Sequence, residues 1–192
     1  MCNLYTQAKS VDEIARLFNA LQMPLVFPDG IPNLQPRDIA ITDPGPIVRT
    51  GADGFDLIVR RWSWPAPNGK PVFNFRSDGR DFSSGRCLIP ADGFFEFTKP
   101  EDPKAKRKHK WLFRLREADQ FAIAGLWRTD PTVGEAWTML TTEPGEDVKP
   151  YHNRQIVVVA PQDFARWLDP TVPAAEVCKP LPPGSLNVEQ VC

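Results

Sequence analysis

The sequence lacks the features that would place it in a membrane or in the secretory pathway. It contains no run of about 20 apolar residues, so we expect no membrane-spanning helix. It opens with Met1-Cys2-Asn3-Leu4-Tyr5, without a basic segment followed by an apolar one, and this start predicts no secretory signal. A cytoplasmic protein with no membrane partner is therefore expected.

Cysteine and histidine are also scarce. No two cysteines have the CxxC spacing of a structural zinc site, and the histidines do not cluster with them. We therefore expect no bound metal and no cofactor, with free thiols as the default in a reducing cytosol. These residues are Cys2, Cys87, Cys178, Cys192, His109 and His152.

A net charge excess is absent as well, because the chain carries a formal charge of −1. The charge is nevertheless uneven. Between Phe55 and Arg116 there are 14 Lys and Arg residues against 7 Asp and Glu residues, and the remainder holds 9 against 17. A basic middle is compatible with one electropositive face for a polyanion, and equally with a few solvated loops. On charge alone, solvated loops are favoured.

The chain is rich in proline, with 21 residues, which excludes a helical bundle and is typical of strands joined by shaped loops. A capping box at Ser10 predicts one helix before Pro24, and Pro161–Leu168 predicts a second, short one. Short apolar runs between turn residues predict the strands Asp38–Thr42, Ile47–Thr50, Phe55–Trp62, Val72–Phe75, Arg86–Pro90, Phe94–Phe97, Lys110–Arg116, Phe121–Trp127, Trp137–Thr142 and Gln155–Ala160.

This pattern predicts one α+β domain over residues 1–192. We expect a curved, mostly antiparallel, barrel-like β-sheet with a few short helices. Pro170–Cys192 is expected to lie over the surface. The charged residues Lys104–Lys110 are expected to form an exposed, mobile loop outside any active site.

Cys2 is the first residue that could carry chemistry. Removal of Met1 would give it an α-amine next to its thiol. An aldehyde condenses with such an amine to an imine, and the thiol then closes a five-membered thiazolidine. The reference pKa of an α-amine is about 7.7–8.0, so a useful fraction is neutral near pH 7. Position alone favours an ordinary second residue.

Three more residues could take part in such chemistry. Glu96 is a carboxylate among aromatic residues, and partial burial would raise its pKa and suit it to proton transfer. His152 lies in a predicted turn, where a histidine can act as an acid or base or merely cap the turn. Asn74 is unusual in a strand, which indicates either a need for its amide or a strand end.

The segment Arg60-Arg61-Trp62-Ser63-Trp64 combines cations with indoles. Single-stranded nucleic-acid binders combine basic tracks with aromatic platforms in this way. Most aromatic residues are simply core, and we expect at least one of these tryptophans to be core.

The order of these signals resembles the SRAP family, the SOS response-associated peptidase-like proteins that process abasic sites. The resemblance runs from Cys2 to about Val188. It rests on five blocks: the Met-Cys start; Arg61-Trp62-Ser63-Trp64, like the family's RWG segment; Asn74-Phe75-Arg76-Ser77, like NARSE; Arg86–Phe97, like RRCLIPADGFYEW; and Ala124-Gly125-Leu126-Trp127 followed by Leu140-Thr141-Thr142 and His152-Asn153-Arg154.

The resemblance implies covalent capture of abasic sites in single-stranded DNA through a thiazolidine at Cys2, protecting the site during the DNA damage response. It implies that Asn74 orients the amine or ring, that Glu96 assists ring opening and proton transfer, and that His152 shuttles protons. A cysteine-dependent autopeptidase that removes the residue before Cys2, and a non-catalytic single-stranded DNA-binding module, remain alternatives.

The implied partner is single-stranded DNA containing abasic sites, bound by a monomer that associates with the nucleoid. The expected DNA-binding residues are Arg76, Arg80, Arg154, Trp62 and Trp64. Some positions depart from the family. Asn3-Leu4 stand where the family commonly reads Gly-Arg, and Asp78-Gly79 replace its Glu-Thr. These changes affect details of DNA contact and leave the expected covalent chemistry intact.

Overall fold

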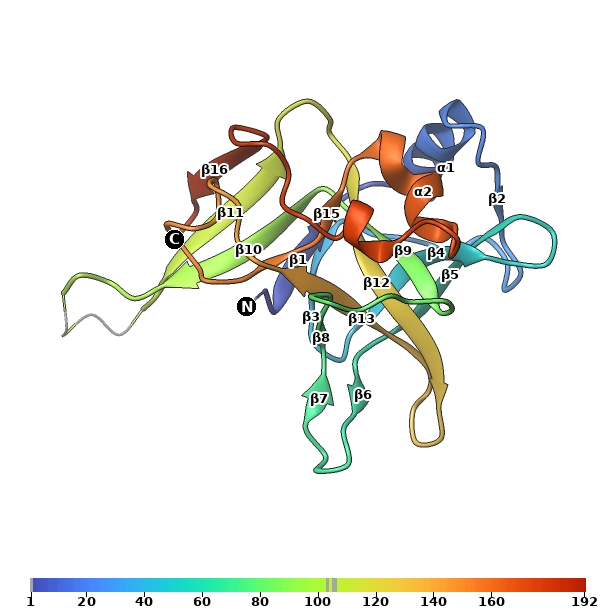
Figure 1. Cartoon of the computed structure of the whole chain (residues 1–192), viewed down its shortest axis with the longest axis horizontal. Helices are drawn as coiled ribbons and strands as arrows, with labels where there is room; N and C mark the ends of the chain where they lie inside the picture. The colour runs from blue at the N-terminus through green and yellow to red at the C-terminus, as the bar shows by residue number, and fades with distance from the viewer. Residues whose placement is uncertain (1, 103, 105–106) are drawn as a thin grey trace.

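The structure is a computed structural model that describes residues 2–102, 104 and 107–192 (Figure 1). Its first helix, α1 (Val11–Ala20), begins where the capping box predicts. The Ser10 backbone N–H donates to the Glu13 carboxylate at 2.8 Å, and the Glu13 N–H donates to Ser10 Oγ at 3.3 Å. The predicted helix is therefore confirmed, and it buries Val11, Ile14 and Phe18.

Five strands close into a barrel. They are β4 (Pro44–Thr50), β5 (Phe55–Trp62), β9 (Arg86–Ala91), β12 (Phe121–Asp130) and β13 (Gly134–Thr142). Antiparallel pairing follows the order β5-β4-β9-β12-β13, and β13 then pairs in parallel with β5 through Trp137 and Trp62. The expected α+β fold with a curved, mostly antiparallel, barrel-like sheet is confirmed.

The central parts of the barrel strands are buried on both faces, which explains the short continuous apolar runs there. On β4, Ile47 joins one core cluster and its neighbour Val48 joins another. The same alternation separates Met139 from Leu140 on β13. One cluster contains the stacked rings of the barrel interior, and the other lies under the helices.

A second sheet lies against the barrel, in the order β16-β11-β10-β1-β3. Its strands are β1 (Leu4–Gln7), β3 (Arg37–Ala40), β10 (Gly93–Thr98), β11 (His109–Leu115) and β16 (Leu186–Gln190). β1 pairs with β10 on one side and β3 on the other, with Tyr5 opposite Phe94. The sequence pattern missed β1 and β16, and β1 is the strand that carries the N-terminal segment into the sheet.

The remaining elements are short. They are β2 (Leu25–Val26), β6 (Trp64–Pro65), β7 (Pro71–Val72), β8 (Asn74–Arg76), β14 (Gln155–Ile156), β15 (Val158–Val159), the 3-10 helices Pro161–Asp163 and Ala174–Glu176, and α2 (Phe164–Leu168). α1 and α2 lie on the same side of the molecule in Figure 1. The centroids of the Phe18 and Phe164 rings, one from each helix, are 5.1 Å apart. No helix of the described residues is long and apolar enough to cross a membrane.

Candidate functional site

Cys2 lies two residues before β1 of the second sheet, within hydrogen-bonding distance of Asn74 in β8. Its side chain is 1% exposed, and its Sγ donates to the Leu4 carbonyl at 3.2 Å. Burial, and after it the nearby Glu96 carboxylate, raises the pKa of the Cys2 thiol from its ordinary 9.0 to about 12. The thiol is therefore protonated at neutral pH, and it needs a proton acceptor before it can act as a nucleophile.

Asn74 reaches Cys2 from the barrel. β8 pairs in parallel with β13, which places Asn74 opposite Met139. The Asn74 amide Nδ2 donates to the Cys2 backbone carbonyl at 2.9 Å. Its Oδ1 is buried and has no hydrogen-bond partner among the described residues. The Asn74 amide therefore positions the main chain of Cys2 through Nδ2, while its Oδ1 can accept a hydrogen bond from a nearby donor.

Glu96 is brought to the same place by the pairing of β10 with β1 and β11. Its side chain is 1% exposed, and it stands opposite Trp111 in the sheet. Burial raises the pKa of Glu96 from its ordinary 4.5 to about 7. A carboxyl group with a pKa near ambient pH can both give and take a proton, as general acid–base catalysis requires.

His152 lies in the turn that precedes β14, with its backbone N–H donating to the Val148 carbonyl at 3.0 Å. Its Nδ1 lies 3.0 Å from both the backbone N and the carbonyl O of Arg154. Burial lowers the pKa of His152 below its ordinary 6.5, while the contact with the Arg154 carbonyl opposes that shift. The ring is therefore neutral at pH 7, with Nδ1 held by the backbone.

His152 and Glu96 line one cavity of about 280 Å³, together with Asn3, Phe97 and Lys108. Asn3 adjoins Cys2 in the chain, and Cys2 is within electrostatic range of Glu96. The structure thus brings Cys2, Asn74, Glu96 and His152 together, although they are far apart in the sequence.

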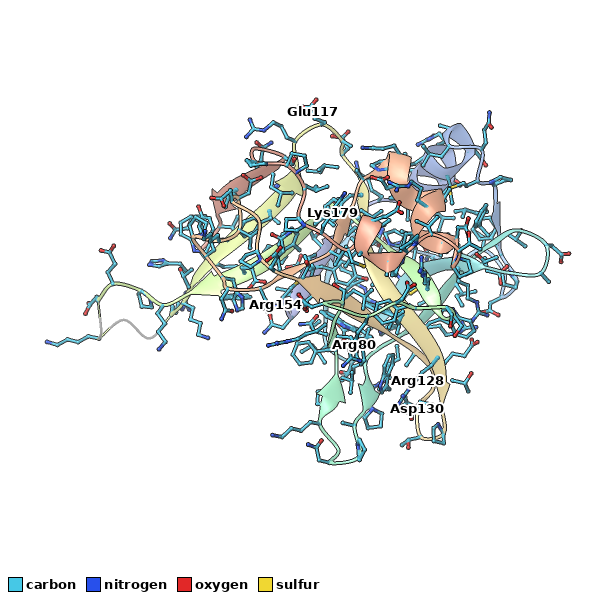
Figure 2. The ribbon with its side chains drawn as sticks, in the orientation of Figure 1. Arg80, Glu117, Arg128, Asp130, Arg154 and Lys179 are labelled. Atoms are coloured by element: carbon cyan, nitrogen blue, oxygen red, sulfur yellow. The ribbon has the colours of Figure 1, made fainter. Side chains whose placement is uncertain are left out.

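The three arginines proposed from the sequence have different surroundings. Arg154 and Arg80 are labelled in Figure 2. The Arg154 guanidinium donates to both carboxylate oxygens of Asp78, at 3.1 and 2.5 Å, and also to the Thr141 carbonyl at 3.0 Å. Arg80 lies over the Phe75 ring at 4.7 Å. Arg76 and Arg80 are exposed, whereas Arg154 is half-buried.

The two tryptophans proposed as base platforms are not available as such. Trp62 is 0% exposed, stacks on Trp137 at 5.4 Å and donates its indole N–H to the Phe73 carbonyl at 2.9 Å. Trp64 is 6% exposed, and the Arg128 guanidinium lies 4.3 Å from its ring centroid. The proposed stacking role fails for both because the fold covers their rings; Trp62 is core, as expected for at least one of them.

Sequence reasoning missed three residues beside the site. Lys108 lines the Glu96 cavity, although Lys104–Lys110 were expected to lie outside the active site. Of that range, residues 105–106 lie outside the described residues, and His109 and Lys110 belong to β11 instead of a loop. Half-buried Trp111 and Tyr151 adjoin Glu96 and His152, respectively. The position of Trp111 follows from strand register, which the sequence did not supply for β11.

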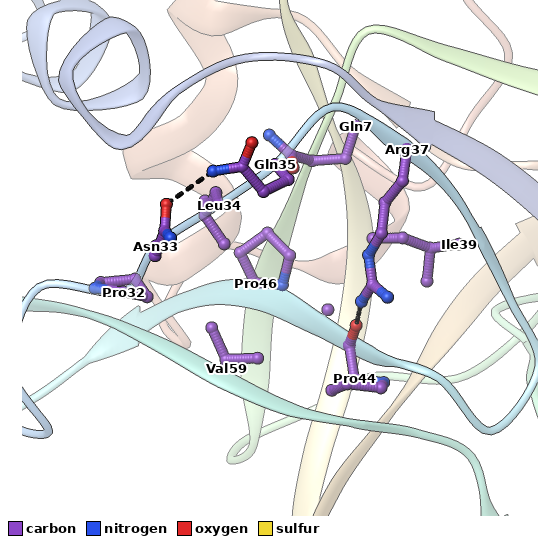
Figure 3. Close-up of a pocket in the computed structure, with 11 residues that line it drawn as sticks. Gln7, Pro32, Asn33, Leu34, Gln35, Arg37, Ile39, Pro44, Pro46 and Val59 are labelled. Carbon is purple, nitrogen blue, oxygen red and sulfur yellow. Dashed lines mark hydrogen bonds between the residues drawn. The ribbon is translucent and has the colours of Figure 1, made fainter.

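A separate hollow of about 450 Å³ lies elsewhere, between the segment after β2 and the start of β4 (Figure 3). Arg37 donates to the Pro44 carbonyl there, and Gln35 donates to Asn33 Oδ1 at 2.7 Å. None of the proposed site residues lines it. Within the described part of the chain, no group of three His, Cys, Asp or Glu side chains could hold a metal ion.

These features, a cysteine at the N-terminal end of a barrel-like α+β fold with Asn, Glu and His gathered around it, agree with the comparison to known families. The chain belongs to the SOS response associated peptidase (SRAP) family, which it matches over residues 1–192.

Named relatives support this membership. The chain is 30% identical over 188 residues to the abasic site processing protein YoaM of Bacillus subtilis (strain 168), covering 88% of this chain and 80% of that protein. It is 30% identical over 189 residues to YoqW, an abasic site processing protein of Bacillus phage SPbeta, covering 88% of this chain and 81% of that one.

Two solved structures share the fold. A protein from Bacteroides thetaiotaomicron has a TM-score of 0.75 at 16% identity, covering 100% of this chain and 92% of that one. A protein from Bordetella bronchiseptica has a TM-score of 0.72 at 19% identity, with 100% of both chains covered.

Proposed function

We propose that this protein captures abasic sites in single-stranded DNA covalently, through a thiazolidine formed by Cys2 after Met1 is removed. The observation that carries the proposal is the environment of Cys2. Its main chain is held by the Asn74 amide, and its thiol lies beside Glu96, whose pKa is raised to about 7. The relatives named as abasic site processing proteins support the choice of substrate.

The reaction has two bond-forming steps. The neutral α-amine of Cys2 adds to C1′ of the ring-opened deoxyribose, and loss of water gives an imine. The thiol then adds across the C=N bond, so that sulfur bonds to C1′ and a proton reaches the nitrogen. Because the pKa of the thiol is about 12 and an α-amine titrates near 8, the amine attacks first.

The surrounding residues supply proton transfer and orientation. Protonated Glu96 donates a proton as the sugar ring opens, and its carboxylate accepts the thiol proton as the thiazolidine closes. His152 exchanges protons with the leaving water, because its ring is neutral near pH 7 and shares the cavity with Glu96. The unsatisfied Oδ1 of Asn74 accepts a hydrogen bond from the Cys2 α-amine.

DNA is held chiefly by cations around the cavity. Arg76 is exposed and lies two residues after Asn74 on β8, so it is placed to pair with a phosphate near Cys2. Arg80 contributes from the neighbouring surface, and Arg154 contributes when it leaves its ion pair with Asp78. Phosphate contacts of this kind make affinity fall steeply with salt.

A second reaction fits the same residues. The family description names a peptidase, and one residue, Met1, precedes Cys2. In this reaction Cys2 and Glu96 remove the residue before Cys2, which would prepare the α-amine that the capture reaction needs. Intact-mass spectrometry of protein expressed as wild type and as Glu96→Gln tests this reaction, because retention of Met1 only in the variant is its expected signature.

The capture proposal is tested with an abasic oligonucleotide and denaturing electrophoresis after heating. Wild-type protein should give a heat-stable adduct. Cys2→Ser should give no heat-stable adduct. A hydroxyl adds to the C=N bond of the imine, and so closes the five-membered ring, far less readily than a thiol. An uncleaved N-terminal extension should also abolish the adduct while the thiol remains. A heat-stable adduct from either variant would refute the thiazolidine and point to a lysine.

A further inference from the structure

The cavity that contains Glu96 and His152 also has a cation in its wall. Lys108 immediately precedes β11, is exposed, and is the positively charged member of the five lining residues. Within residues 2–102, 104 and 107–192, its ammonium group has no hydrogen-bond or ion-pair partner. Arg154, by contrast, is occupied by Asp78 and Thr141. Lys108 is therefore available to an incoming anion.

An aromatic pair neighbours two of the residues that line this cavity. Trp111 stands opposite Glu96 in the β10–β11 register, and Tyr151 directly precedes His152 in the chain. The Trp111 and Tyr151 ring centroids are 4.7 Å apart at an angle of 58°. Both residues pack against the core cluster but are only half-buried, unlike Trp62 and Trp64.

We propose that Lys108, Trp111 and Tyr151 form a subsite for the nucleotide that adjoins the abasic sugar. Lys108 pairs with the phosphate of this nucleotide, and the two rings contact its base. The inference rests on the proposed function. It assigns residues that bind the neighbouring nucleotide, which the reacting groups do not contact. A sugar within a DNA strand carries a phosphate on each side, so one phosphate must lie near a cavity whose floor is the ionisable Glu96.

The phosphate contact is tested by binding an oligonucleotide that carries tetrahydrofuran, an abasic analogue without an aldehyde. Lys108→Ala should weaken binding roughly five- to tenfold at low salt and reduce the slope of log K against log salt by about 0.7, the value for one phosphate contact on a single strand. Lys108→Arg should restore the slope. Lys104→Ala removes an equal charge at an exposed position earlier in the chain and should leave the slope unchanged.

The aromatic contact is tested by replacing the base next to tetrahydrofuran with a second tetrahydrofuran, on the 5′ or the 3′ side. In the wild type, one of the two replacements should cost about tenfold in affinity, as expected for one stacked base. Tyr151→Leu should remove that difference, and Tyr151→Phe should keep it. Thermal unfolding of both variants checks that the fold is intact.

The outcomes separate this inference from the proposed function. If the wild type forms no adduct with a reactive abasic oligonucleotide, the capture chemistry is wrong, whatever the binding data show. If the wild type forms the adduct but Lys108→Ala and Lys104→Ala have the same salt slope, the phosphate contact is overturned. The aromatic contact is overturned if the wild type binds three oligonucleotides equally: the one with both neighbouring bases, the one without the 5′ base and the one without the 3′ base.

Discussion

Two carboxylates beside the site illustrate how the surroundings set the chemistry of one functional group. Glu96 is buried between strands, and burial raises its pKa to about 7. Asp78 lies at the surface, and its hydrogen bonds from the Arg154 guanidinium lower its pKa below the ordinary 3.8. The first can exchange protons near neutral pH, whereas the second stays ionised and fixes an arginine. Burial therefore raises the pKa of one carboxyl group into the neutral range, and an ion pair holds the other ionised beside Arg154.

The largest effect is expected from Glu96→Gln on the rate of capture. An amide cannot give or take a proton in either step, and general acid–base help is worth about 10²–10⁴-fold. Single-turnover adduct formation should slow accordingly, and the rate inflection near pH 7 should disappear from its pH profile. A full wild-type rate would show that Glu96 is structural only.

The same substitution should stabilise the protein at high pH. Because the pKa of Glu96 is raised from 4.5 to about 7, its contribution to stability is complete below pH 4.5 and is lost as the pH rises through 7. Glu96→Gln should then raise the free energy of unfolding by about 3 kcal/mol at pH 8 and by little at pH 4. Urea unfolding at both pH values measures the difference, and an equal gain at both would contradict it.

Ser63→Gly is a control for that pH dependence, because it affects a buried residue without an ionisable group. Ser63 is 1% exposed, has φ of 82°, and its hydroxyl has no partner among the described residues. Glycine relieves the left-handed backbone and removes the unpaired hydroxyl, and its greater chain entropy opposes both effects. We expect a net gain of about 1 kcal/mol, the same at pH 4 and pH 8. A loss of stability would contradict the assigned strain.

The smallest effect is expected from Asp78→Asn. Neutralising Asp78 releases Arg154 for phosphate, so affinity for single-stranded DNA should rise about two- to fivefold, the range of an exposed ion pair. The salt slope should also increase by about 0.7. Asp81→Asn is the matched control, because Asp81 lines the same surface cavity but pairs with Arg86. Equal slopes for the two variants would show that Asp78 does not compete with DNA.

The sequence by itself determined the local structure and nominated the residues of the candidate site. Capping at Ser10 predicts α1 because the hydrogen bonds involved span three residues. Apolar runs between turns predict the barrel strands, because each run has to be buried on both faces. The resemblance to family motifs nominates Cys2 as a nucleophile and Glu96 as an acid–base group. The motifs do not say how far apart the two side chains lie in space.

Tertiary structure alone decided which of those residues meet and which surfaces remain open. The Asn74 amide reaches Cys2 through the pairing of β8 with β13, a contact across 72 positions that no local pattern contains. Parallel closure of β13 on β5 buries Trp62 against Trp137, so an indole of the basic-aromatic segment lies in the core. The β10–β11 register places Trp111 opposite Glu96. Periodicity reports whether a side chain is buried, but only long-range strand pairing determines what it is buried against.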